Sequence, residues 1–219
     1  MTAYVVPFVL YLGLIQIAAA YPDQYGWLYP TVVTLVSVVT IALLRGRHLL
    51  GPHLRVIAGV SVGIIGIALW IGLCRLHCEQ AIAEYLPDWL QPKRPAFNPW
   101  ESIDQPLARW AFVAARLAGL AILVPIVEEL FWRGFLLRWL TSANWQQQKL
   151  DAFGIRSFVV VTLLFALAHP EWLAALVYCT FLNGLLYWKG DLWNCIVAHG
   201  VSNLILGIYI LSTGSWELW

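Results

Sequence analysis

Residues 120–137 of the chain read LAILVPIVEELFWRGFLL, an apolar run that is interrupted by three ionisable side chains, Glu128, Glu129 and Arg133. In the middle of a membrane helix such a residue costs at least about 2.5 to 3.5 kcal/mol on insertion scales. It therefore persists where it is paired, hydrated or used. The run predicts a membrane helix, and its charged residues are candidates for a functional site.

The composition places the whole chain among integral membrane proteins. Of its 219 residues, 61% are hydrophobic and 11% are charged, which leaves too few polar side chains to cover a soluble globule. Thirteen Trp and nine Tyr residues suit helix ends at the level of the lipid headgroups. A net charge of +1 without a basic stripe argues against nucleic acid as a partner.

Long apolar runs predict an all-α fold, a polytopic transmembrane helical bundle, because about 20 apolar residues cross a bilayer. The predicted spans are Tyr4–Ala20, Trp27–Leu44, Val56–Leu73, Leu107–Leu140, Ile155–His169, Trp172–Trp188 and Leu192–Ser212. The fourth run would reach ~50 Å as one helix, so we expect it to be kinked or broken near Pro125 and to cross once or twice. The bundle then has seven or eight spans.

The chain is expected to form a single integrated membrane domain from two sequence regions. Residues 1–106 hold three transmembrane helices and a polar connector, Cys74–Pro106, whereas residues 107–219 hold the site candidates. Arg45, Arg47 and Arg55 lie between the second and third spans. Because cations favour cytoplasmic loops, this loop and the amino terminus are expected to face the cytoplasm.

Three ionisable residues on different spans lie at one predicted depth. Glu128 precedes Leu140 by 12 residues, His169 follows Arg156 by 13, and His199 follows Lys189 by 10. At 1.5 Å per residue, each lies roughly 15 to 20 Å from the inner surface. Unrelated polar residues would scatter in depth, so the coincidence predicts one shared site.

Helical spacing assigns faces to these side chains. Glu129 and Arg133 stand four residues apart with the acid first, the favoured order for an ion pair on one face, and Glu128 points about 100° away. His199 and Asn203 also share a face. One glutamate is thus neutralised, and the other is free to act as a general base toward a water molecule, which suits hydrolysis.

Three short patterns follow one another on successive predicted spans: Glu128-Glu129-x-x-x-Arg133, Phe165-x-x-x-His169 and His199-x-x-x-Asn203. In this series the chain resembles the CPBP family of intramembrane proteases. That family includes the type II CAAX prenyl endopeptidases and bacteriocin-processing, Abi-like proteins. The resemblance covers about Leu107–Ser212, so residues 107–219 are expected to form the CPBP-like catalytic helical core.

The resemblance implies a role for each residue. Glu128 would activate the hydrolytic water with His169, and Glu129 with Arg133 would orient this first group. His199 with Asn203 would stabilise the oxyanion of the tetrahedral intermediate. The family has also been described as metalloproteases, and Glu128, His169 and His199 can equally serve as three zinc ligands, with water as the fourth. The chain lacks a His-Glu-x-x-His arrangement, which slightly favours the metal-independent glutamate mechanism.

The expected substrate is a membrane-tethered peptide or protein, with lipidated CAAX-type proteins included, in the lipid bilayer of a prokaryotic plasma membrane. A non-enzymatic alternative stays open. A transporter or a bacteriocin-immunity-type protein would use the same buried ionisable residues as a proton or ion relay. The amides of Asn183 and Asn194 are further candidates to line the pocket, and Glu171 is a candidate for its rim.

Overall fold

Helices form the part of the chain described by the computed structural model, which comprises residues 1–83, 85 and 96–219. The long helical segments are α1 (Thr2–Ala19), α2 (Tyr25–Leu44), α3 (Ile57–Arg75), α6 to α8 (Pro106–Thr141), α9 (Ile155–Leu167), α10 (Trp172–Lys189) and α11 (Leu192–Thr213). The short ones are η1 (Pro22–Gln24), α4 (Cys78–Ala83), α5 (Pro99–Ser102) and η5 (Trp216–Leu218). In the predicted connector Cys74–Pro106, residues 84 and 86–95 lie outside the described residues.

The fold class predicted from the apolar runs is confirmed, because the described helices form a bundle with five candidate membrane spans. These five are Thr2–Ala19, Pro22–Leu44, Ile57–Arg75, Pro106–Thr141 and Leu192–Thr213. The predicted span Ile155–His169 corresponds to α9, which has 13 residues and ends at Leu167. At 1.5 Å per residue α9 covers only about 20 Å, so its end lies inside the bundle.

The long fourth run is one continuous helical segment, and it is not broken at Pro125. Its departures from α geometry are two π-helical segments, η3 (Gly119–Leu123) and η4 (Leu130–Leu136), which flank α7 (Val124–Glu129). α6 (Pro106–Ala118) and α8 (Leu137–Thr141) continue it at the two ends. Pro125 is accommodated in the first turn of α7, where its missing N–H is tolerated.

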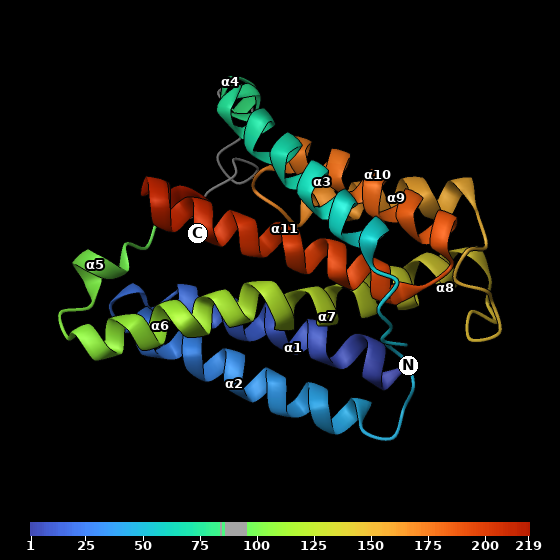
Figure 1. Cartoon of the computed structure of the whole chain (residues 1–219), viewed down its shortest axis with the longest axis horizontal. Coiled ribbons are helices and arrows are strands. Elements are labelled where there is room, and N and C mark those ends of the chain that lie inside the picture. Colours follow the sequence, from blue (N-terminus) through green and yellow to red (C-terminus); the bar gives the residue numbers. More distant parts are fainter. Residues whose placement is uncertain (84, 86–95) are drawn as a thin grey trace.

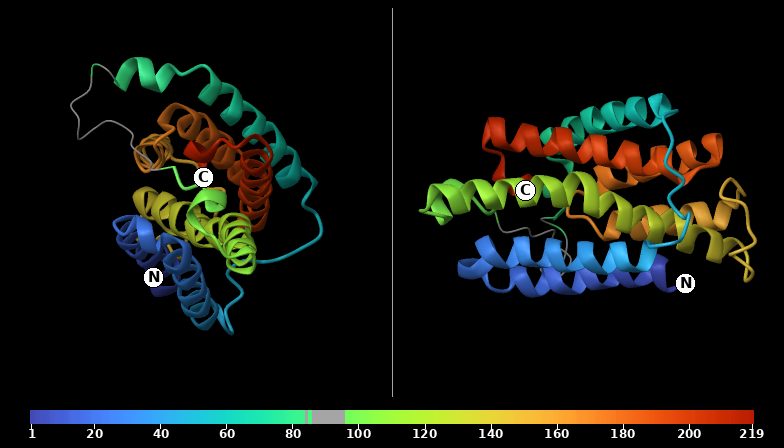
Figure 2. Two further views of the ribbon diagram at one scale, coloured as in Figure 1. Left: turned by 90° about the vertical axis from the view of Figure 1, so that its left-hand side faces the viewer. Right: turned by 60° about the horizontal axis from the view of Figure 1, so that its bottom comes forward.

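The bundle has two halves on either side of the long segment (Figures 1 and 2). α1 and α2 pack together on one side, and α2 also contacts α6. α3 packs against α10 and α11 on the other side, and α11 contacts η3 and α7. The two termini lie at opposite ends of the bundle in Figure 1.

Glycines let α3 approach α11 closely. A Cβ atom added at Gly59 would lie 2.6 Å from the backbone oxygen of Asn194, and one at Gly63 would lie 2.5 Å from that of Ala198. Small residues spaced four apart are a common means of tight helix packing in membranes. The contact fixes α11, which carries His199 and Asn203, against the bundle.

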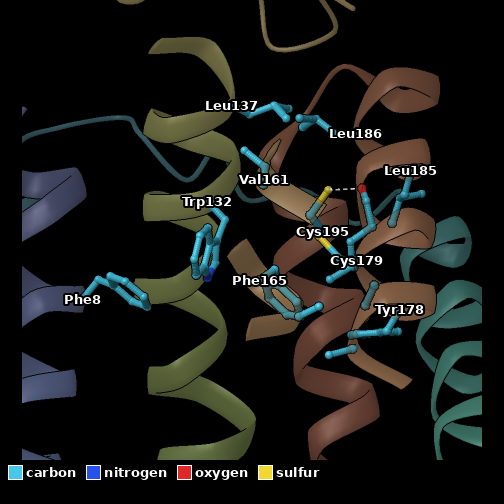
Figure 3. Packing of buried hydrophobic residues seen from close by; sticks show 14 residues of the cluster. Phe8, Trp132, Leu137, Val161, Phe165, Tyr178, Cys179, Leu185, Leu186 and Cys195 are labelled. Carbon is cyan, nitrogen blue, oxygen red and sulfur yellow. Dashed lines mark hydrogen bonds between the residues drawn. The ribbon is translucent and has the colours of Figure 1, made fainter. Parts of the chain in front are cut away.

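An apolar core packs beside the deepest polar residues (Figure 3). Trp132 of η4 meets Phe165 of α9 edge to face, with ring centroids 5.6 Å apart. Cys179 of α10 and Cys195 of α11 are fully buried in the same cluster, and the Cys195 thiol donates to the carbonyl of Leu182. This core holds the long segment, α9, α10 and α11 in a fixed relation.

Candidate active site

A cavity of about 410 Å³ lies between the two halves of the bundle. It is lined by four of the six predicted site residues, Glu128, His169, His199 and Asn203, which come from α7, the α9–α10 turn and α11. The cavity extends to Ala19 and Trp219 at the end of the bundle that holds the carboxyl terminus. The residues that the sequence placed at one depth therefore share one cavity.

Glu129 and Arg133 form the predicted ion pair, in full burial. Arg133 Nη1 donates to Glu129 Oε1 at 3.1 Å, and both side chains are 0% exposed. The same oxygen accepts a hydrogen bond of 2.8 Å from His199 Nδ1. The resemblance implied that the pair would orient Glu128 and His169. Instead, Glu129 of α7 is hydrogen-bonded to His199 of α11.

The remaining nitrogens of Arg133 are held by α10. Nε donates to Asn183 Oδ1 at 3.1 Å, and Nη2 contacts Cys179 Sγ at 3.0 Å. Asn183 in turn donates to Thr162 Oγ1 of α9 at 3.1 Å. The guanidinium also lies 5.0 Å from the ring centroid of Phe165. A buried arginine thus has polar or aromatic partners on every side, as a charge at this depth requires.

Glu128 reaches the cavity without an ion-pair partner among the described residues. Its side chain is 8% exposed, and its Oε2 accepts no hydrogen bond from the described part of the chain. The predicted division of the two glutamates, one neutralised and one directed to the pocket, agrees with this geometry.

His169 lies past the end of α9, which corrects its predicted place inside a span. The α conformation is disfavoured for the residue that precedes a proline, and His169 precedes Pro170. The helix accordingly ends at Leu167. His169 Nδ1 bonds to the carbonyl oxygen of Phe165 at 2.7 Å, and the two rings stack at 4.4 Å. Because a carbonyl can only accept, Nδ1 carries the hydrogen in this bond.

Asn203 is held by a carbonyl that Pro125 leaves without its usual donor. In η3 the N–H of Val124 bonds to the oxygen of Gly119, five residues earlier. The next such bond would join Pro125 to Leu120, but proline has no N–H. The Leu120 oxygen instead accepts from Asn203 Nδ2 at 2.9 Å. This contact positions the Asn203 amide at the cavity wall.

Close packing brings α11 to η3 at the same level. A Cβ atom on Gly200 would lie 2.7 Å from the backbone oxygen of Ala121. Ser202 donates to the carbonyl of His199 and bonds to the Tyr178 hydroxyl at 2.7 Å. These contacts hold the turn of α11 that carries His199 and Asn203.

The three predicted zinc ligands line one cavity but are not gathered as a coordination shell. Among the described residues, no group of three or more His, Cys, Asp or Glu side chains is placed to hold a metal ion together. Glu129, the acid bonded to His199, is already shared with Arg133. A zinc ion held by Glu128, His169 and His199 therefore stays a prediction of the resemblance.

The fold and the site define a helical integral membrane protein with buried ionisable groups around an internal cavity. Residues 110–205 are similar to the family described as type II CAAX prenyl endopeptidase Rce1-like. The match confirms the resemblance and includes all six predicted site residues. No curated protein and no solved structure matches the chain.

Two of the three further residues that the sequence analysis assigned to the pocket lie outside its lining, and one residue of the lining was not identified from the sequence. Asn183 was expected to line the pocket, but it holds Arg133 away from the cavity. Asn194 was expected there too, but it bonds to Asp191, Gly59 and Arg55 at the start of α11. Glu171 does line the cavity. The buried Arg116, which also lines it, had no recognisable motif in the sequence.

Proposed function

We propose that the protein is an intramembrane endopeptidase that hydrolyses a peptide bond in a membrane-tethered substrate. The observation that carries the proposal is the shared cavity, where an acid without an ion-pair partner among the described residues, two imidazoles and an amide converge. The family match supports a CAAX-type substrate, which is a prenylated chain in which a cysteine is followed by three residues. A cavity with apolar walls, among them Leu12, Ile15 and Ile67, suits a lipidated segment.

In this proposal Glu128 is the general base. Its carboxylate takes a proton from a water molecule, and the hydroxide attacks the scissile carbonyl carbon. When the tetrahedral intermediate collapses, the C–N bond breaks and Glu128 returns the proton to the leaving amine. His169 Nε2 is directed by the bond from Nδ1 to Phe165 and accepts from the same water.

The developing oxyanion is stabilised from α11. When the His199 ring carries both hydrogens, its Nδ1–H bonds to Glu129 and its Nε2–H can donate to the oxyanion. Asn203 uses one amide hydrogen on Leu120, and an amide nitrogen has a second one to donate. Such preorganised donors are each worth about 3 to 4 kcal/mol in a transition state. No step in this route uses a metal ion.

The decisive experiment compares cleavage by the purified parent protein and by Glu128→Gln. The substrate is a farnesylated peptide in lipid vesicles, and the products are measured by mass spectrometry. We expect the rate of cleavage by the variant to be at least about a hundredfold lower, since general-base catalysis contributes about 10² to 10⁴ in rate.

Glu101→Gln, at an exposed position on α5, is the matched control. Equal product from Glu128→Gln and the parent would refute the proposal and favour the relay alternative, which predicts pH-dependent ion flux without cleavage.

The expected orientation also places the cavity. If the loop with Arg45, Arg47 and Arg55 is cytoplasmic, the cavity end marked by Ala19 and Trp219 faces away from the cytoplasm. In a prokaryotic plasma membrane the substrate would then enter from the outer side. Labelling of Cys74, at the outer end of α3, by an impermeant maleimide in intact cells tests this orientation; protection of Cys74 until the cells are permeabilised would reverse it.

A further inference from the structure

A second buried charge lines the cavity at a distance from the glutamates. Arg116 of α6 is 8% exposed. Its Nη1 donates to the Tyr25 hydroxyl at 3.1 Å, and its guanidinium carbon lies 4.4 Å from the centroid of the Tyr29 ring and 5.5 Å from that of Trp219. These contacts are with neutral aromatic groups. They hold the cation in place without neutralising it.

Arg116 has no acidic partner in the described part of the chain. No Asp or Glu oxygen there lies within ion-pair distance of it, in contrast with Arg133, whose partner is Glu129. Its Nε is buried and makes no hydrogen bond to the described residues. A buried cation with an unused donor in a cavity wall is costly unless an anion completes it. A carboxylate fits best, because it accepts two parallel hydrogen bonds from a guanidinium.

The π segment η3 brings Arg116 to the same face as Glu128. Twelve residues separate the two, which in a continuous α-helix would leave them about 120° apart. A π turn holds one extra residue, and this reduces the angle to about 20°. Both side chains do line the same cavity. The irregularity of the long helix therefore aligns the two charges along one wall.

The distance between Glu128 and Arg116 along this wall matches the length of a short C-terminal peptide. Twelve residues rise about 18 Å. About 9 Å of this rise is taken up by three contacts. These are the hydrogen bond between Glu128 and the water, the distance from the water to the scissile carbonyl carbon, and the hydrogen bond between the guanidinium and the carboxylate. The remaining ~9 to 10 Å is the length of three extended residues at about 3.3 Å each.

We propose that Arg116 binds the free C-terminal carboxylate of the substrate, three residues beyond the bond that Glu128 hydrolyses. This inference rests on the proposed function and assigns to Arg116 the recognition of the substrate's C-terminal end. The enzyme then cleaves near a chain end because Arg116 measures the distance to the carboxylate. A chain that continues past this point, or ends in an amide, lacks the anion that Arg116 requires.

The test uses a pair of farnesylated peptides that have three residues after the modified cysteine and differ only at the end, a free acid or an amide. For the parent protein we expect the amide to raise KM by about tenfold or more, the size of a charge-assisted hydrogen bond, with kcat within about threefold. Arg116→Gln should cleave both peptides with the same high KM, and Arg116→Lys should keep part of the preference. Arg109→Gln removes a cation two turns earlier on α6, where Arg109 binds the Ile103 carbonyl, and should keep the full preference.

Binding of the same two peptides to Glu128→Gln, measured by equilibrium dialysis, tests the carboxylate preference without turnover and without a change at Arg116. Equal affinity there, or an undiminished preference for the acid in Arg116→Gln, would overturn the proposal. A KM that follows the phosphatidylglycerol content of the vesicles and ignores the peptide end would also overturn it, because Arg116 would then hold a lipid phosphate. Loss of cleavage of both peptides with a retained acid preference in binding would instead count against the proposed function alone.

Discussion

His199 Nδ1 lies 2.8 Å from Glu129 Oε1, the oxygen that also accepts from Arg133. One carboxylate oxygen thus joins an imidazole of α11 to a guanidinium of η4, and Arg133 extends the link to Asn183 and Cys179 of α10. Glu129 is completely buried and does not line the cavity. The second glutamate therefore holds His199, which lines the cavity together with Glu128.

Removal of Glu129 should damage the fold, whereas removal of the Glu128 charge should not. In Glu129→Ala the guanidinium of Arg133 loses its counter-ion in full burial, and breaking such a pair typically costs about 3 to 5 kcal/mol. We expect a clearly lower melting temperature in detergent. Glu128→Gln removes a charge that has no ion-pair partner among the described residues, so its melting temperature should equal or exceed that of the parent. Equal melting of Glu129→Ala and the parent would show that the ion pair contributes nothing.

Asn183 should affect activity through Arg133 without touching the cavity. Asn183→Ala leaves Arg133 Nε and Thr162 Oγ1 without their partner, and an unmet buried group costs about 1 to 3 kcal/mol. We expect reduced thermal stability and a reduced kcat with an unchanged KM. Thr180→Ala, an exposed position on the same helix, serves as the control. A raised KM in Asn183→Ala would indicate direct contact with substrate.

The sequence predicted the parts of the site that depend on local helical spacing. Glu129 and Arg133 are four residues apart, so the ion pair follows from the repeat of one helix. The common depth of Glu128, His169 and His199 also follows from counting residues along predicted spans, and the three do line one cavity. Both inferences needed only the rise and turn of an α-helix.

The links that depend on helix packing could not be predicted. Glu129 meets His199 across 70 positions of sequence, and which oxygen is shared depends on how α11 crosses the long segment. The π segments were missed because their extra residues leave no regular pattern in an apolar run. For the same reason Arg116 could not be placed on the face of Glu128. The end of α9 before His169 could have been found, because Pro170 is a local signal.

Chelation separates the two hydrolytic mechanisms that the sequence left open. Since Glu128, His169 and His199 are not gathered as a coordination shell and the proposed route uses no metal, we expect cleavage to survive dialysis against 1,10-phenanthroline. Metal analysis of the dialysed protein by plasma mass spectrometry must accompany the activity measurement. Loss of activity on chelation and its return with stoichiometric zinc would establish the metal-dependent alternative.

The close contact between α11 and η3 should not tolerate a methyl group. In Gly200→Ala the new Cβ would lie 2.7 Å from the Ala121 oxygen, and backbone cannot give way as a side chain can. Overpacking of this kind typically costs about 1 to 3 kcal/mol. We also expect lower kcat, because the shift separates Asn203 from Leu120. Gly184→Ala on α10 is the matched control, since a Cβ there meets nothing within 4 Å and should be neutral. Similar melting temperatures for the two variants would contradict the tight contact.

Pro125 should be required for activity and dispensable for stability. In Pro125→Ala the new N–H can bond to Ala121 as in an α-helix, or to Leu120 in place of Asn203, and either bond competes with the present arrangement. Conversion of η3 to α geometry would also rotate Arg116 away from Glu128 by about 100°. We therefore expect kcat/KM to fall by about tenfold or more, as for loss of an oxyanion donor, while the melting temperature stays level or rises.

Pro30→Ala is the control for loss of a proline alone, because Pro30 lies inside α2 and outside the cavity lining; this variant should keep its activity. Full activity in Pro125→Ala would mean that the π segment has no part in placing Asn203.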